Sequence, residues 1–386
     1  MQRKIIYISH WRFPSEKTMT PLIMKTCEGF IREGFSVELW IPKRPSGFAG
    51  VDPFIKHGIQ KRFPIYALSS IGSINKFGKL GFILMAFTFN LSVSARLLRE
   101  RKNNTSLILY GHDIRDFIVP SFLKLPLFIE IHDFYESSFN FINRLVLKKT
   151  SGLIVTNTFK QKAIESRYGF PLDRMICQPN AVSFEMFDIP VSRQQAREKL
   201  SFPSGIKIVL YTGHLFSWKG VYTLAESASY LSSDTYIYFV GGTKEDRKAL
   251  EGFVTAKKLP RIVFLEHQEH VNIPFFQKAA DILVLPNTAK EVASKYETSP
   301  VKLFEYMASG VPIVASDVPS IREIVSDKEV FFFIPDDPQN LAKVIRNAMN
   351  DERAVENRSR ASKVLARTHS WPSRAQAITA LIKKCT

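Results

Sequence analysis

Two glutamates in the C-terminal half of the sequence stand on either side of a predicted helix start. Glu297 and Glu305 are separated by seven residues. Between them, Ser299 is a favourable N-cap residue and Pro300 suits the first helical position. A helix start offers unpaired N–H groups and the positive end of the helix dipole, both of which attract phosphate. Carboxylates accept strong hydrogen bonds from hydroxyl groups. The pattern therefore suits a ligand that carries both phosphate and hydroxyl groups.

Two lysines and a glycine extend this chemistry. Lys302 falls in the first turn of the predicted helix, where an acidic residue would suit the dipole better, so a bound anion would account for it. Further upstream a predicted strand ends at Thr212 and is followed by Gly213, and Lys219 stands at the end of the next loop. Gly213 would let the backbone approach a ligand closely, and Lys219 could hold a phosphate. The spacing differs from that of a Walker loop, and the first strand lacks the G-x-G-x-x-G pattern of dinucleotide-binding enzymes.

These residues need a scaffold, and the sequence predicts an α/β one. Short apolar runs alternate with longer amphipathic stretches, which is typical of βαβ units with a parallel sheet. The chain of 386 residues is too long for one ordinary core, and the alternation breaks near Phe187. We therefore expect one domain over residues 1–187 and a second from residue 188 onward. The predicted strands are Lys4–Ser9, Val37–Ile41, Leu107–Tyr110, Leu127–Ile131, Gly152–Thr156, Ile206–Thr212, Thr235–Val240, Ile262–Leu265, Ile282–Leu285, Pro312–Ala315 and Val330–Ile334.

The composition is that of a folded globular protein, with 45% hydrophobic and 23% charged residues. The three cysteines, Cys27, Cys177 and Cys385, are far apart in the sequence. Their spacing fits neither a metal site nor a disulfide framework, so we expect reduced thiols in the cytoplasm.

The motifs together resemble those of group 1 (family 4) glycosyltransferases, which are nucleotide-sugar enzymes of the GT-B fold. The resemblance is carried by E-x7-E, by the run S-P-x-K-L-F-E-Y-M-A-x-G-x-P-I-V-A-S from Ser299, by Y-T-G-H-L-x-x-W-K-G from Tyr211, and by P-N-A-V from Pro179. It implies two Rossmann-like α/β domains that face a central cleft. The acceptor would bind to residues 1–187, joined by a C-terminal helix (about 370–386) that crosses back, and the donor to residues 188–369.

The resemblance also assigns roles in the donor site. Glu305 would accept the ribose hydroxyls, and Glu297 would contact the transferred sugar as a catalytic residue. The diphosphate would be held by Lys219, by the loop at Gly213, and by the helix start at Ser299, Pro300, Val301 and Lys302. His214 stands where family members commonly have Arg, and a neutral imidazole offers one hydrogen bond in place of a charged fork.

In the N-terminal half, His132 ends a predicted strand at the family's position for a catalytic-site histidine. His112 ends another predicted strand and is the alternative. The first loop lacks the family's usual Gly-Gly pair; Lys17 and Thr18 could replace it in contacting donor or acceptor, or could serve only as a gating loop.

The expected reaction is transfer of a hexosyl unit from a nucleoside diphosphate sugar to an acceptor hydroxyl with retention of configuration. No cofactor or metal is expected, because the positive groups would stabilise the departing diphosphate. Two alternatives stay open: another GT-B enzyme such as a nucleotide-sugar 2-epimerase, and a non-catalytic sugar-nucleotide-binding protein.

The positive charge of the chain is concentrated in its first half. Residues 1–187 carry 26 Lys plus Arg against 14 Asp plus Glu, a net charge of +12, whereas the remainder carries +5. Residues 80–95 are uncharged but shorter than the roughly 20 apolar residues of a membrane span. The flanking basic residues are Lys76, Lys79, Arg96, Arg99, Arg101 and Lys102.

This pattern predicts a peripheral protein at the cytoplasmic face of the membrane that docks on anionic lipid. We expect a lipid-linked or cell-surface glycan precursor as acceptor, in polysaccharide biosynthesis. Nucleic acid is not an expected partner, because helix-turn-helix, zinc and RNP-type motifs are absent from the sequence.

Overall fold

The structure is a computed structural model that describes residues 3–15, 19–48, 50–71, 74–103, 106–132 and 140–386, without the side chains of 74–77 and 103. It divides into two compact units. Unit 1 comprises Met1–Gln178 and Trp371–Thr386, and unit 2 comprises Pro179–Ser370. The division falls ahead of the break expected near Phe187, because Val182, Phe184 and Phe187 are buried in the core of unit 2.

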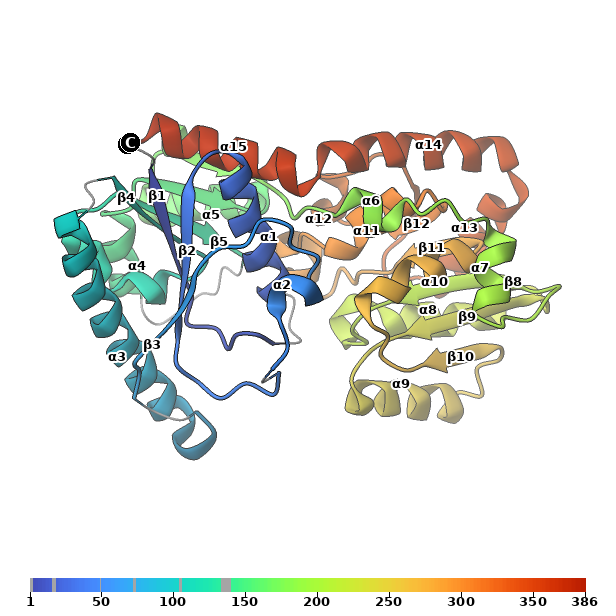
Figure 1. Cartoon of the computed structure of the whole chain (residues 1–386). Coiled ribbons are helices and arrows are strands. Elements are labelled where there is room, and N and C mark those ends of the chain that lie inside the picture. The colour runs from blue at the N-terminus through green and yellow to red at the C-terminus, as the bar shows by residue number, and fades with distance from the viewer. Residues whose placement is uncertain (1–2, 16–18, 49, 72–73, 104–105, 133–139) are drawn as a thin grey trace. The chain divides into compact units, whose positions relative to one another are not determined.

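The described residues of unit 1 form a seven-stranded parallel sheet in the order β3-β2-β1-β4-β5-β6-β7 (Figure 1). The strands are β1 (Lys4–Ile8), β2 (Ser36–Pro42), β3 (Ile65–Leu68), β4 (Leu107–Gly111), β5 (Leu127–Ile131), β6 (Gly152–Val155) and β7 (Met175–Cys177). The helices are α1 (Met19–Arg32), α2 (Pro53–Lys56), α3 (Ile74–Asn103), α4 (Asn140–Leu147), α5 (Thr158–Tyr168) and α15 (Trp371–Lys384), with short 3₁₀ turns η1 (Ile114–Phe117), η2 (Pro120–Leu123) and η3 (Leu172–Arg174).

Side chains of β1 alternate between two helical layers, as the period of a strand requires. Ile5 and Tyr7 pack with α1 and α15, while Ile6 and Ile8 pack with α3, α4 and α5. Both faces of the sheet are thus covered, which is why its strands read as continuous apolar runs.

The last helix packs in unit 1, far in sequence from the rest of that unit. Gly29 on α1 faces Ala375 on α15, and a Cβ added at Gly29 would lie only 2.6 Å from the Cβ of Ala375. The missing side chain lets the two helices approach closely. The C-terminal helix α15 thus belongs to unit 1, as expected (Figure 1).

Helix α3 is buried on one side only. Phe89, Val93 and Leu97 are fully buried in unit 1. Residues Gly78–Lys102 are the one stretch in the described part of the chain that is long and apolar enough to cross a membrane, with a mean hydropathy of 1.5 and 39% of its most apolar window buried. The helix bends at Gly78, whose φ is 51°.

The described residues of unit 2 form a six-stranded parallel sheet in the order β10-β9-β8-β11-β12-β13. The strands are β8 (Lys207–Thr212), β9 (Thr235–Val240), β10 (Ile262–Leu265), β11 (Ile282–Leu285), β12 (Ile313–Ser316) and β13 (Phe331–Phe333). The helices are α6 (Phe184–Phe187), α7 (Arg193–Lys199), α8 (Val221–Ser227), α9 (Lys244–Ala256), α10 (Ile273–Ala279), α11 (Val301–Ser309), α12 (Pro319–Arg322), α13 (Pro338–Asn350) and α14 (Glu352–Thr368), with short turns η4 (Ser217–Lys219), η5 (Ala228–Tyr230), η6 (His270–Asn272) and the π-helical η7 (Ala293–Glu297).

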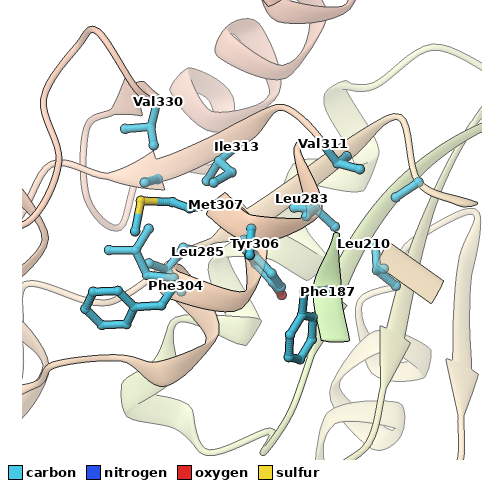
Figure 2. Packing of buried hydrophobic residues seen from close by; sticks show 14 of the residues in the cluster. Phe187, Leu210, Leu283, Leu285, Phe304, Tyr306, Met307, Val311, Ile313 and Val330 are labelled. Carbon is cyan, nitrogen blue, oxygen red and sulfur yellow. The ribbon is translucent and has the colours of Figure 1, made fainter. Parts of the chain in front are cut away.

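Helix α11, which carries Lys302 and Glu305, is anchored deep in unit 2. Phe304, Tyr306 and Met307 are fully buried, and Figure 2 shows them among side chains of the sheet such as Leu283 and Leu285. Seven of its nine residues are buried, which fixes where its first turn lies. A helix held this firmly can position a ligand without moving.

The start of α11 differs by one residue from the sequence prediction. Pro300 occupies the N-cap position and the helix begins at Val301, so the expectation that Ser299 caps the helix was wrong. The Ser299 side chain is used elsewhere: its hydroxyl accepts a hydrogen bond from the Asn180 N–H at 3.0 Å. The predicted end is confirmed, since Gly310 is left-handed with a φ of 70°.

Candidate active site

Three loops of unit 2 meet at the carboxyl edge of its sheet. The loop after β8 begins at Gly213, whose φ of 114° favours glycine. A Cβ at Gly220 would lie 1.8 Å from the carbonyl oxygen of Pro286, which follows β11. A Cβ at Gly241, after β9, would lie 2.9 Å from the carbonyl oxygen of Gly213. Here β8 lies between β9 and β11, where the strand order reverses, and such points bind ligands in open α/β sheets.

Lys302 points from the first turn of α11 into this loop cluster. Its Nζ donates a hydrogen bond to the Tyr211 hydroxyl at 2.5 Å and lies 3.8 Å from the centre of that ring. A Cβ at Gly213 would come within 3.1 Å of the same Nζ, so glycine leaves room for the ammonium group. The predicted partners Gly213 and Lys302 are therefore in contact range.

Two lysines, Lys219 and Lys302, bring positive charge to this loop cluster. Burial lowers the pKa of Lys219 to about 7. Burial, followed by repulsion from Lys219, holds the pKa of Lys302 well below its usual value. His214 has a lowered pKa as well, from burial first and then from the charge of Lys302. Burial is the first cause in all three groups, and a bound anion would favour their protonated forms.

Glu305 brings a carboxylate to the next turn of α11. The residue is 9% exposed, and its Oε1 lies 2.8 Å from Nε2 of His270, at the start of η6. Burial alone would lower the pKa of His270, but the hydrogen bond to Glu305 and its charge raise it. Glu305 therefore accepts a hydrogen bond from His270 where it was expected to accept them from ribose hydroxyls. Sequence reasoning missed His270, which lies outside every motif.

The remaining donor-site residues lie just before α11. Glu297 is the last residue of η7, and its side chain is partly buried. Ser299 and Pro300 are both buried. Besides its hydroxyl contact, Ser299 uses its carbonyl oxygen to accept a hydrogen bond from Nδ2 of Asn180 at 2.6 Å. This places the P-N-A-V motif against the start of α11, and Asn180 thereby fixes the segment that leads into the first turn.

The predicted histidines belong to unit 1, at the carboxyl ends of β4 and β5. His132 is paired through Nε2 with Glu130, whose carboxylate is fully buried. The other partners of Glu130 are the Tyr110 hydroxyl at 2.6 Å and Nη2 of Arg374 on α15, also at 2.6 Å. Although burial opposes ionisation, Arg374 and His132 hold the pKa of Glu130 well below its usual value.

His112 sits deeper than His132. Burial, reinforced by repulsion from His132, lowers the pKa of His112 to about 3, so its ring is neutral. Its Nδ1 lies 3.2 Å from the Tyr7 hydroxyl, and the ring centres of His112 and His132 are 6.4 Å apart. His132 is the more accessible of the pair and therefore the better candidate for contact with a substrate.

Two further expectations are not decided by this geometry. Lys17 and Thr18 lie outside the described residues. Within the described part of the chain, no three His, Cys, Asp or Glu side chains are grouped so that they could hold a metal ion.

Comparison with known sequences finds a family model that matches most of unit 2. Residues 192–364 match the family described as glycosyl transferases group 1. D-inositol 3-phosphate glycosyltransferase from Xylanimonas cellulosilytica is 22% identical over 252 residues, which are 62% of this chain and 58% of that protein. The putative teichuronic acid biosynthesis glycosyltransferase TuaC of Bacillus subtilis is 24% identical over 155 residues, 40% of this chain and 36% of that protein. Both matches cover less than two thirds of the relative's length.

Comparison with solved structures covers both units. HepE of Anabaena, crystallised in complex with UDP, aligns over 99% of this chain and 100% of that one, with a TM-score of 0.77 and 17% identity. WaaG, described as a glycosyltransferase involved in lipopolysaccharide biosynthesis, aligns over 98% and 99% with a TM-score of 0.68 and 15% identity. With two parallel sheets of this kind, the chain has the expected GT-B fold.

Proposed function

Residues 192–364 belong to the group 1 glycosyltransferases, and on this basis we propose that the protein transfers a hexosyl unit from a nucleoside diphosphate sugar to an acceptor hydroxyl, with retention of configuration. The observation that carries the proposal is Lys302, which points from the first turn of α11 to the loop at Gly213, where the charge of Lys219 also acts on it. Two partly buried lysines near a helix N-terminus fit a diphosphate. Structures of HepE with UDP and with UDP-glucose support this class of donor.

In the proposed reaction, the acceptor oxygen attacks the anomeric carbon while the bond to the donor phosphate oxygen breaks. The acceptor proton passes to the departing phosphate on the same face of the sugar. Negative charge grows on the diphosphate as it leaves, so the main task of the site is electrostatic. Lys302 and the N–H groups of the first turn of α11 are suited to it, because the buried residues of α11 hold them in place, and Lys219 on η4 adds its charge.

The carboxylates and the histidine complete the proposal. Glu305 would exchange its contact with His270 for the ribose hydroxyls, and Glu297 would contact the hydroxyls of the transferred sugar. His132 would act near the anomeric carbon, oriented by its bond to the buried Glu130. Glu130 is a positioning residue in this scheme, since it reaches the substrate only through His132.

We further propose that no divalent cation is required, because the two lysines supply the positive charge that a metal would otherwise bring. Transfer measured in EDTA should then equal transfer measured with added Mg²⁺. A strict requirement for Mg²⁺ or Mn²⁺ would contradict this part of the proposal.

Donor binding and transfer test the proposal directly. UDP-, GDP- and ADP-sugars should be screened by thermal shift, since a bound ligand stabilises the folded protein by RT ln(1 + [L]/Kd). With the nucleotide sugar that gives the largest shift, Lys219→Ala and Glu297→Ala should both lose transfer and donor hydrolysis. Lys248→Ala, an exposed lysine on α9, is the matched control. Rates like those of the wild type in either test variant would refute the role given to that residue.

We also propose that unit 1 docks on an anionic membrane surface through α3, at the cytoplasmic face, and takes a lipid-linked glycan precursor there. The outer face of α3 carries six large apolar side chains at helical spacing, between 46% and 76% exposed: Leu80, Ile83, Leu84, Phe87, Leu91 and Leu98. Exposed basic residues stand near both ends of this stripe, namely Lys79, Arg99, Arg101 and Lys102. An apolar face with basic ends is the pattern of a helix that lies in the membrane interface, where each basic residue contributes about 1 kcal/mol.

A further inference from the structure

Unit 1 contains a cavity that none of the proposed roles uses. It has a volume of about 380 Å³, within the usual range of ligand pockets. Its lining residues, together called the arginine pocket, are His10, Trp11, Arg12, Ser15, Arg44, Phe82 and Arg115. Three guanidinium groups around one cavity of this size suit an anion, since Arg presents a planar fork of donors to phosphate oxygens.

The charge of the arginine pocket is only partly balanced. Arg115 pairs with both carboxylate oxygens of Asp113, and His10 pairs with Asp116 through Nδ1 at 2.8 Å. Arg44 donates to the carbonyl oxygen of His10 at 3.3 Å, but no carboxylate among the described residues lies within ion-pair distance of it. Burial, followed by repulsion from Arg12, lowers the pKa of Arg44. Arg44 thus has a like charge nearby, which an anion bound beside it would offset.

The arginine pocket lies where an open α/β sheet binds ligands. His10 to Arg12 follow β1, Arg44 follows β2 and Arg115 follows β4. In the sheet β1 lies between β2 and β4, so the strand order reverses there. The loops are held together: the Ser46 hydroxyl, after β2, donates to the carbonyl oxygen of Pro14, after β1, at 2.7 Å.

One wall of the pocket comes from α3. The Phe82 ring lies 5.4 Å from the ring of His10 and 5.3 Å from the guanidinium carbon of Arg115. Leu80 and Ile83, which flank Phe82 on the same helix, are 76% and 56% exposed. A ligand in the pocket would therefore lie beside guanidinium groups and the Phe82 ring, and Ile83 next to Phe82 is part of the exposed apolar face of α3.

We infer that the arginine pocket binds the phosphate or diphosphate group of the glycosyl acceptor, and that this acceptor carries the group on an apolar chain that runs over the outer face of α3. The inference rests on the proposed function, because it makes the ligand the acceptor of that reaction. The diphosphate occupies the space between Arg12 and Arg44, and the first part of the apolar chain packs on Phe82 and Ile83.

Calorimetry with two probes tests the inference. Inorganic pyrophosphate and farnesyl diphosphate are titrated into the protein with UDP present in excess, so that the lysines of unit 2 are occupied. Arg44→Gln should weaken both probes by roughly tenfold or more, as expected for the loss of charge-assisted hydrogen bonds. Arg12→Gln gives a second reading of the same pocket. Arg353→Gln, an exposed arginine on α14, removes the same charge from unit 2 and should leave both affinities unchanged.

The outcomes separate the parts of the inference. Farnesyl diphosphate should bind more tightly than pyrophosphate, and Ile83→Gln should remove that difference alone. Equal affinity of the wild type for the two probes would overturn the inference that the acceptor carries an apolar chain over α3. If Arg44→Gln and Arg12→Gln bind both probes as tightly as the wild type, the inference that the arginine pocket binds a diphosphate is overturned. If UDP itself does not bind, the proposed function fails, while a loss of pyrophosphate binding in Arg44→Gln would still uphold the anion site.

Discussion

Donor binding should take up protons from solution, because the site holds a lysine that is largely neutral above pH 7. The pKa of Lys219 is about 7 in the free protein, against an ordinary value of 10.5. At pH 8 only about one Lys219 side chain in ten is therefore protonated, whereas at pH 6 about nine in ten are. A diphosphate beside the ammonium group favours the charged form and raises the pKa again.

The expected uptake by Lys219 follows from these fractions. Binding of UDP-glucose should take up about 0.9 proton at pH 8 and about 0.1 at pH 6. Lys302, whose pKa is also lowered, adds to the uptake in the same direction. Since the bound state holds more protons, the affinity for UDP-glucose should fall as the pH rises above 7, by up to tenfold per pH unit for one proton.

The assay is calorimetric titration at each pH in buffers with different enthalpies of ionisation, from which proton uptake is obtained directly. Lys219→Met should lower the uptake at pH 8 by most of one proton, while Lys248→Met on α9 should leave it unchanged. An observed heat that is independent of the buffer at pH 8, with tight binding of UDP-glucose, would refute the reasoning on the two lysines.

Three further predictions concern contacts in the two units. Gly213→Ala should weaken UDP binding, because the new Cβ would lie 3.1 Å from Nζ of Lys302 and the φ of 114° is unfavourable for alanine; calorimetry checks this. Arg374→Met should lower the free energy of unfolding by about 3–5 kcal/mol in urea titrations, because it removes the guanidinium that pairs with the fully buried carboxylate of Glu130. Phe87→Ser should reduce binding to vesicles containing anionic lipid without changing the rate on a soluble acceptor, and equal binding of the wild type to anionic and zwitterionic vesicles would contradict the docking proposal.

The inner strands could be predicted from the sequence because burial on both faces leaves a clear signal. The predicted bounds of β5, Leu127–Ile131, and of β9, Thr235–Val240, are those of the structure. Strands β3 and β7 were missed. Both lie at the edges of the unit 1 sheet and are mostly only partly buried. Their apolar runs have only four and three residues, which is too short to be told from a loop by pattern alone.

The residues of the candidate site also differ in whether the sequence alone could reveal them. Gly213, Lys219, Lys302 and Glu305 could be found because each belongs to a local pattern of helix start, strand end or loop. His270 and Arg374 could not, since their partners are distant: His270 contacts a residue 35 positions away, and Arg374 a residue 244 positions away. Such pairs form only when the chain folds, and a single sequence carries no local trace of them.

The two sheets offer one physical reason for the two anion sites that we propose. Counted from the first strand of each unit, both sheets begin in the order third, second, first, fourth, fifth, so each has its reversal beside its first strand. In unit 2 that edge carries Gly213 and the lysines, and in unit 1 it carries the arginine pocket. Ammonium groups act as compact point charges, which suits a diphosphate whose charge changes during the reaction. Guanidinium forks fix the orientation of an anion, which suits a group that must only be held. The difference between lysine and arginine therefore supports our inference that the anion in the arginine pocket anchors the acceptor and takes no part in the chemistry.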